Sequence, residues 1–240
     1  MYDPQVGRWH VIDGKAEKYT SFTPYAYALN NPVIFLDPDG KDIEIFYGKN
    51  NSQSFVYNGK NGDKAPSVGF VKDFVKAYNY NVGNDGGANL KEAATNPNLH
   101  ILVKTAGGWG SQLGGDGKTI YWDSDRALKG DWNFPLSAEN QDEYWISPAT
   151  ILEHEFDHQM SSIKDPEGYE NRLKTVDNKY ENEEERRVIT GSEKEQAEKN
   201  GEIKKDQVRK SHGGYLKKVD DPTQNKPKEK ELQQFIYPFK

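Results

Sequence analysis

Two histidines four residues apart, with a glutamate between them, are the residues of this sequence best suited to chemistry. His154-Glu155-Phe156-Asp157-His158 fits the H-E-x-x-H pattern. On a helix, residues i and i+4 share one face about 5–6 Å apart, so both imidazoles can converge on one Zn²⁺ ion. Zinc lowers the pKa of a bound water towards roughly 7, and Glu155 can then take its proton and deliver it to a leaving amine. The pattern therefore predicts zinc-assisted peptide hydrolysis; the alternative is two core or solvated histidines on one helix.

A catalytic zinc ion also needs a third protein ligand and an open position for water. An acidic run, Glu183-Glu184-Glu185, follows the motif on a second expected helical region, residues 179–199. By itself such a run is more often a solvated helix face. The histidines outside the motif are His10, His100 and His212.

Residues 184–191, with the sequence EERRVITG, resemble a segment of two groups of zinc proteases. One group is the clostridial neurotoxin light chains, and the other is the type III effector metalloproteases of enteric pathogens with their toxin-domain relatives. Both carry Glu-Glu-x-Arg-Thr-(Phe/Ile)-Gly. The resemblance implies that Glu185 is the third zinc ligand and that Glu184 supports the site from behind. Glu184 and Glu193 remain the alternatives for the third ligand.

The resemblance extends over about residues 119–212. Both protease groups have a downstream Arg-x-x-Tyr that faces the reacting carbonyl, and the matching residues here are Arg209-Lys210-Ser211-His212. Arg209 is therefore expected to stabilise the developing oxyanion. His212 stands where the family has Tyr and could donate a hydrogen bond. Thr119 to Trp122 would fit the edge strand along which zincins lay their substrate.

Residues 1–40 are similar to the end of a bacterial RHS-repeat core. In such proteins this junction precedes a variable C-terminal toxin, which a paired Asp-Pro motif releases. Asp37 fits the second member of that pair, and Asp13 stands at the first, where Gly14 and Ala16 depart from the pattern. The alternative is a peptide that packs on the rest of the chain or trails from it. The matching motifs are Tyr2-Asp3-Pro4, Gly7-Arg8-Trp9, residues 24–27, Asn30-Asn31-Pro32 and residues 37–40.

The element pattern predicts an α+β, zincin-like domain over residues 41–240. A small mixed or antiparallel sheet should pack on the H-E-x-x-H helix and on a second, Glu-bearing helix. The motif helix should begin at the N-cap Ser147 with Pro148 at its first position and run through about Ile163. Residues 123–146 read as irregular and the charged tail, about 218–240, as mobile. Expected strands are 43–47, 54–57, 100–104 and 119–122; further helices are 67–83 and a turn at 90–94.

Composition limits the classes of function. The formal net charge of -6 argues against a nucleic-acid partner, and with it against a metal nuclease. The absence of cysteine excludes disulfides, thiolate metal sites and a Cys nucleophile. The sequence contains no run of about 18 apolar residues, so no membrane-spanning helix is expected. The N-terminus lacks signal-peptide features. Export as part of an RHS or secretion-system effector is expected, with a cytoplasmic location as the alternative.

These observations predict a zinc-dependent endopeptidase with one Zn²⁺ per chain, acting as an RHS-associated toxin on a protein of a target cell. An immunity protein and an RHS shell are its expected partners. The alternative is a catalytically decayed RHS-tip module that binds a partner, a hypothesis motivated by His212 at the Tyr position. The substrate, the cleavage site and the oligomeric state are not readable from the sequence.

Overall fold

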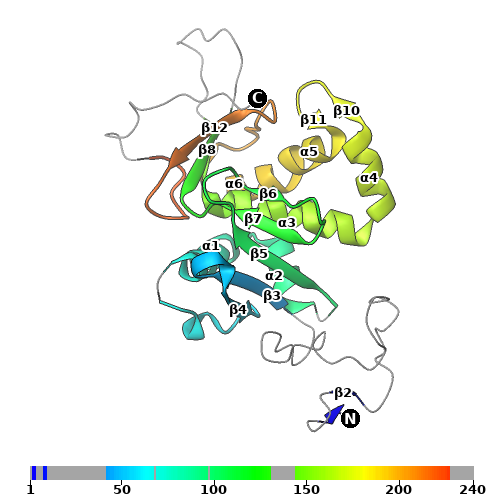
Figure 1. Ribbon diagram of the computed structural model, residues 1–240. Coiled ribbons are helices and arrows are strands. Elements are labelled where there is room, and N and C mark those ends of the chain that lie inside the picture. Colours follow the sequence, from blue (N-terminus) through cyan, green and yellow to red (C-terminus); the bar gives the residue numbers. More distant parts are fainter. Residues whose placement is uncertain are drawn as a thin grey trace. The chain divides into compact units, whose positions relative to one another are not determined.

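A computed structural model describes residues 2–3, 8–9, 42–67, 69–96, 98–130 and 144–227 (Figure 1). The chain divides into two compact units, Met1–Lys41 and Asp42–Lys240. In the first unit, β1 (Tyr2–Asp3) and β2 (Arg8–Trp9) form an antiparallel pair. The remaining RHS-like motifs, with Asp13 and Asp37, lie outside the described residues. The second unit is an α+β domain with a mixed sheet, as predicted.

A five-stranded sheet lies at the centre of the second unit, in the order β4-β3-β5-β7-β6. β3 pairs with β4 as an antiparallel hairpin, whereas β3, β5 and β7 run parallel. β6 returns antiparallel to β7. The strands are β3 (Asp42–Tyr47), β4 (Gln53–Tyr57), β5 (His100–Thr105), β6 (Gln112–Leu113) and β7 (Thr119–Trp122).

The expectation that Thr119–Trp122 is an edge strand is wrong, because β7 has a hydrogen-bonded neighbour on each side. Gln112 and Leu113 form the edge instead. These two residues belong to the Gly-rich loop 107–117, whose sequence has no alternation of apolar and polar residues to indicate a strand. The hairpin forms because the backbone turns back through Gly114–Gly117, where the Gly117 N–H donates to the Gly114 carbonyl at 2.8 Å.

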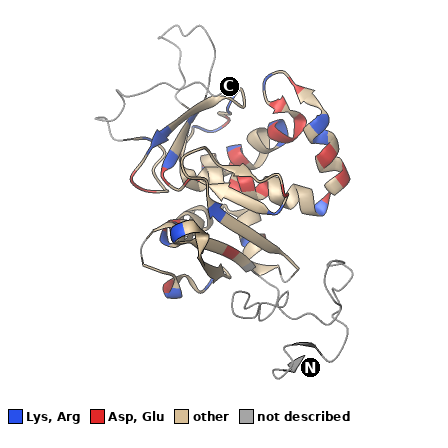
Figure 2. Ribbon diagram, in the orientation of Figure 1, with Lys and Arg blue, Asp and Glu red and all other residues tan. Residues whose placement is uncertain are grey.

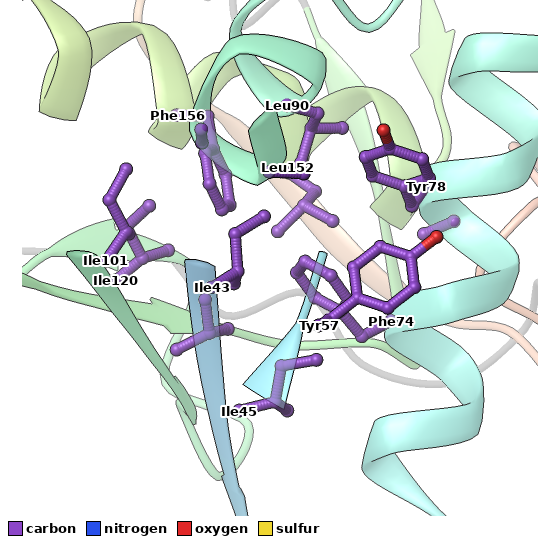
Figure 3. Packing of buried hydrophobic residues seen from close by; sticks show 14 of the residues in the cluster. Ile43, Ile45, Tyr57, Phe74, Tyr78, Leu90, Ile101, Ile120, Leu152 and Phe156 are labelled. Carbon is purple, nitrogen blue, oxygen red and sulfur yellow. The ribbon is translucent and has the colours of Figure 1, made fainter. Parts of the chain in front are cut away.

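Two helices cover one face of this sheet and explain its apolar pattern. α1 (Phe70–Gly83) and α2 (Ala88–Thr95) lie between β3 and β5 in the chain. Ile43 and Ile45, two residues apart, point to the same side, where they meet Phe74 of α1 and Leu90 of α2 (Figure 3). The predicted helix over 67–83 is confirmed except at its start, since it begins at Phe70.

α3 (Pro148–Lys164) carries the H-E-x-x-H motif, and its bounds agree with the predicted helix to within a residue. The Ser147 hydroxyl accepts a hydrogen bond from the Thr150 N–H at 3.2 Å, which is the expected N-cap. Leu152, Phe156 and Met160 recur every four residues and join the core of the sheet. The helix is therefore held on its apolar side, and the two histidines of the motif lie elsewhere on it.

The second helical region differs from the prediction of one helix over 179–199. α4 (Pro166–Lys174) precedes it, followed by a hairpin of β10 (Val176–Asp177) and β11 (Glu181–Asn182). Helix then begins at Glu183 and is interrupted by a π-helical turn, a feature often found at functional sites. Figure 2 shows acidic residues on α3, α4 and α5. The segments are α5 (Glu183–Val188), the π-helical turn Ile189–Glu193 and α6 (Lys194–Lys199).

A second sheet corrects the expectation that residues 123–146 are irregular. β8 (Arg126–Gly130) pairs antiparallel with both β9 (Trp145–Ile146) and β12 (Gly214–Lys218). The chain after β12 continues to pack, because the Ala149 N–H donates to the Pro222 carbonyl at 2.9 Å. Phe235, Tyr237 and Phe239, the aromatic residues near the C-terminus, lie outside the described part of the chain. No helix among the described residues is long and apolar enough to cross a membrane.

Candidate metal centre

Three side chains from α3 and α5 converge on one point. His154 and His158 are both buried, one helical turn apart, and their Nε2 atoms are 3.0 Å apart. Glu185, in the first turn of α5, places Oε1 3.3 Å from His158 Nε2 and Oε2 3.5 Å from His154 Nε2. The ligand atoms of the three residues lie within 4.8 Å of one another, so the group could hold a metal ion. Two imidazoles and a carboxylate suit several divalent ions, zinc among them.

The separations in this group are of the size found between the ligand atoms of a small metal ion. Zinc bonds of about 2.0–2.1 Å at tetrahedral angles place neighbouring ligand atoms about 3.3–3.4 Å apart. The two Nε2 atoms lie 3.0 Å apart, close to that value, and each lies 3.3 or 3.5 Å from a different oxygen of Glu185. In addition, Glu185 Oε2 is buried without a hydrogen-bond partner among the described residues. An orphaned carboxylate oxygen is costly, and a bound cation would remove that cost.

The position of Glu185 follows from the hairpin that precedes α5. Asn182, at the end of β11, adopts extended backbone and accepts a hydrogen bond from the Glu185 N–H at 2.9 Å through its side chain. This N-cap starts α5 at Glu183. The Glu185 side chain then faces the two imidazoles from the first turn of the helix.

A buried carboxylate lies behind His154. Glu193, at the end of the π-helical turn, places Oε2 2.8 Å from His154 Nδ1. Arg209 donates to both carboxylate oxygens of Glu193, at 3.1 and 2.6 Å, and the Tyr144 hydroxyl donates at 2.9 Å. Burial opposes ionisation of Glu193, but Arg209, His154 and Tyr144 outweigh it and lower its pKa to about 2.

A second buried carboxylate lies behind His158. Glu184 Oε1 is 3.3 Å from His158 Nδ1, and Glu184 is fully buried. Arg172 of α4 donates to it at 2.6 Å, and Arg187 donates to both of its oxygens. Burial raises the pKa of Glu184, but hydrogen bonds from His158 and the two arginines hold it well below its usual range.

This arrangement leaves both Nε2 atoms for a metal, because each Nδ1 faces a carboxylate. Without a metal, burial lowers the pKa of both imidazoles, but the carboxylates raise it more. The pKa reaches about 10 for His154 and about 8 for His158. Protons and a metal ion would therefore compete for these imidazoles.

Glu155 is buried beside His154, Glu185 and His158, the three residues that we call the metal group because they could hold an ion. Burial is the main cause that raises its pKa above the ordinary value, while His154 and His158 lower it and Glu185 and Glu193 raise it further. A carboxylate whose pKa is raised towards the working pH is suited to accept and return a proton.

The structure brings Arg209 and His212 to the group in different ways. Arg209 is only 4% exposed, and each of its nitrogens donates: two to Glu193, and Nη1 to the His212 carbonyl at 2.9 Å. Its guanidinium thus lies behind His154. His212 places Nε2 3.5 Å from Glu185 Oε2, and its side chain is 41% exposed. Elsewhere, His100 pairs with Glu44 on the sheet at 3.2 Å, and His10 lies outside the described residues.

Several contributing residues were missed from the sequence. Arg172 and Tyr169 lie on α4, a helix that no expectation covered, although Asp165 and Pro166 are a usable N-cap and N1 pair. Burial raises the pKa of Tyr169 to about 12, and the nearby carboxylates of Glu184, Glu185 and Glu155 add to it. Tyr144, which holds Glu193, had no recognisable signal.

A cavity of about 550 Å³ opens at the carboxyl ends of β3, β5 and β7, and none of the metal group lines it. Its acidic groups already have partners. Asp73 accepts a hydrogen bond from the Ser124 hydroxyl at 2.9 Å, and Asp123 accepts from the backbone of Gly108 and Gly110. The convergence of ligand atoms, not the size of a hollow, therefore marks the candidate site.

Comparison of the chain with protein-family models, with curated proteins and with solved structures gives no match. What the fold and the site define is an α+β domain whose buried His-His-Glu group could hold a metal ion.

Proposed function

We propose that this chain is a zinc-dependent endopeptidase with a zincin-like arrangement of its active-site helix. One observation carries the proposal: the ligand atoms of two imidazoles and one carboxylate lie within 4.8 Å of one another, and the residue beside the first imidazole is a buried glutamate. His154, His158 and Glu185 would hold one Zn²⁺. The resemblance of residues 184–191 to zinc proteases supports the same ligand set.

Each remaining residue has a role that its contacts support. A zinc ion held here would supply a Lewis acid that polarises the scissile carbonyl and acidifies water. Glu155 would take the proton of the attacking water and return it to the leaving amine. Glu193 and Glu184 would keep the two imidazoles oriented through their Nδ1 atoms.

Arg209 and His212 divide the roles that the resemblance assigned to the Arg-x-x-Tyr segment. The buried pairing of Arg209 with Glu193 supports a positioning role behind His154 rather than contact with the oxyanion. His212 is half-exposed beside Glu185, so its imidazole is the group that would donate a hydrogen bond to the substrate carbonyl.

The substrate class we propose is a protein of a target cell. The N-terminal motifs, which resemble an RHS-core junction, favour a toxin or effector delivered as part of a longer assembly, with an immunity protein as partner. A decayed, metal-holding binding module is the second candidate. His212 at the Tyr position and the burial of Arg209 favour that alternative.

The decisive experiment combines metal analysis with digestion of an unfolded protein mixture. We expect about one zinc per wild-type chain, and Glu155→Gln should keep the zinc while cleavage falls at least about hundredfold. His158→Ala should lose the zinc. Glu167→Gln is the matched control, since Glu167 is an exposed residue of α4 and makes no ion pair among the described residues.

Two results would contradict the proposal. If the chain binds no zinc after reconstitution, His154, His158 and Glu185 are not a zinc-binding set. A zinc-loaded wild type that cleaves nothing, or that cleaves equally well with Glu155→Gln, favours the binding module instead.

A further inference from the structure

Glu181 stands at a backbone position where glycine or asparagine is usual. Its φ is 73°, in the left-handed region, and it is the first residue of β11, directly after the loop from β10. The loop turns tightly because Asp177 Oδ1 accepts from the N–H groups of Lys179 and Tyr180 at 2.8 and 2.9 Å. A side chain with a Cβ is disfavoured in that conformation. Such strain at a non-glycine residue clusters at functional sites.

The Glu181 side chain reaches the edge of the metal group. Its Oε2 lies 2.9 Å from His212 Nδ1, while His212 Nε2 lies 3.5 Å from Glu185 Oε2. The imidazole of His212 therefore lies between a carboxylate of the hairpin and the carboxylate of the metal group. His154 and His158 show the same pattern, each with Nδ1 towards one glutamate and Nε2 towards Glu185.

The backbone around this pair is fixed from both sides. The His212 N–H donates to the Lys179 carbonyl at 3.0 Å, and the Tyr180 hydroxyl donates to the Arg209 carbonyl at 2.9 Å. The hairpin thus sets the position of residues 209–212. These contacts do not set the rotation of the His212 ring. The contact with Glu181 can set it.

We propose that Glu181 is a positioning residue that orients the His212 imidazole, with Nδ1 towards the hairpin and Nε2 towards the metal group. The inference rests on the proposed function for what His212 then does to a substrate. His212 lies outside the set of mutually close metal-ligating atoms, and its half-exposed ring can contact a peptide bound over that set. A carboxylate on Nδ1 fixes which nitrogen of an imidazole carries the proton and which face it presents.

Glu181→Gly is the sharpest test, because glycine accepts the left-handed backbone while the carboxylate is lost. We expect its melting temperature to be no lower than wild type and its zinc content to be unchanged. Its kcat should fall about tenfold to a hundredfold, with little change in KM. In a His212→Ala background, the same substitution should cause no further loss. Glu183→Gln is the matched control, since Glu183 is exposed two residues away and has no ion pair in the described part of the chain.

Imidazole ¹H–¹⁵N correlation spectra give a readout that does not depend on activity. The chain has five histidines, and His212→Ala assigns the relevant signal. We expect the His212 nitrogens of wild type to show a protonated, hydrogen-bonded Nδ1, and Glu181→Gly alone to move that signal. Glu183→Gln should leave it in place.

The outcomes separate this inference from the proposed function. If wild type cleaves its substrate but Glu181→Gly cleaves equally well with an unmoved His212 signal, the positioning role is refuted and the peptidase stands. If wild type neither holds zinc nor cleaves while Glu181→Gly still shifts the His212 signal, the peptidase fails and the orienting contact stands.

Discussion

Replacing Arg209 by methionine tests whether this residue acts through Glu193 or on the substrate. Arg209→Met removes two hydrogen bonds to Glu193 and one to the His212 carbonyl. Both members of the ion pair are buried, at 4% and 1% exposure. Removing one partner leaves an uncompensated buried charge, which costs about 3–5 kcal/mol. Because domains of this kind are stable by only about 5–15 kcal/mol, the change should be large and measurable.

The metal site should weaken together with the fold. Glu193 would keep only the Tyr144 hydroxyl and His154 as partners, so its hold on the His154 ring loosens. Loss of such outer contacts reduces metal affinity by about tenfold to a hundredfold. Adding Glu193→Gln to Arg209→Met removes the orphaned charge and should restore part of the lost stability, but not the zinc affinity.

Urea unfolding of the metal-free chain measures the first effect, and zinc competition with a chelator measures the second. Lys205→Met is the matched control, because Lys205 is an exposed lysine close in sequence. If Arg209→Met stays within about 1 kcal/mol of wild type and keeps its zinc affinity while kcat alone falls, the positioning role is refuted. Arg209 would then face the oxyanion, as the resemblance implies.

Three further changes test the fold around the site. Burial raises the pKa of Glu202 to about 7, above its ordinary 4.5. Between pH 4.5 and 7 the folded chain therefore holds a proton that the unfolded chain has lost, so the free energy of unfolding falls as pH rises, by up to about 3 kcal/mol. Glu202→Gln should flatten this pH dependence in urea unfolding. An unchanged slope would contradict the raised pKa. Ser147→Ala removes the N-cap of α3 and should lower the free energy of unfolding by about 1–2 kcal/mol in thermal melts. Phe156→Ala empties a fully buried position and should cost about 3–5 kcal/mol in urea unfolding, whereas a loss below about 1 would contradict its packing.

The sequence was most informative where structure is local. Ser147, Pro148 and the spacing of apolar residues defined α3 because capping and helical periodicity act within a few residues. The same holds for the helix ending at Gly83 and for the hairpin of β3 and β4. Glu185 joins the two histidines in the group that could hold a metal ion, as the resemblance of residues 184–191 implies.

What the sequence concealed depends on long-range pairing. β8 and β12 are far apart in the chain, and in neither do apolar and polar residues alternate clearly enough to predict a strand. They nevertheless pair over five residues each. The π-helical turn breaks the regular period, so Glu193 could not be placed on a helical wheel. Its position behind His154 was therefore not predictable, and Glu193 remained only an alternative ligand.

Charge pairing explains why we propose only one of the three glutamates as a metal ligand. Glu184 is held by Arg172 and Arg187, and Glu193 by Arg209. A carboxylate that already accepts charge-assisted hydrogen bonds from arginine has little left to offer a metal ion.

Glu185 differs from both neighbours, because no arginine or lysine pairs with it among the described residues. Its contacts are the Nε2 atoms of the three histidines His154, His158 and His212. A buried carboxylate needs a compensating charge. In the metal-free chain protonation of His154 or His158 can supply that charge, and a divalent ion would supply it while using the Nε2 lone pairs for coordination. The arginines thus pair with two of the glutamates and leave the third, Glu185, as the one that could bind a metal ion.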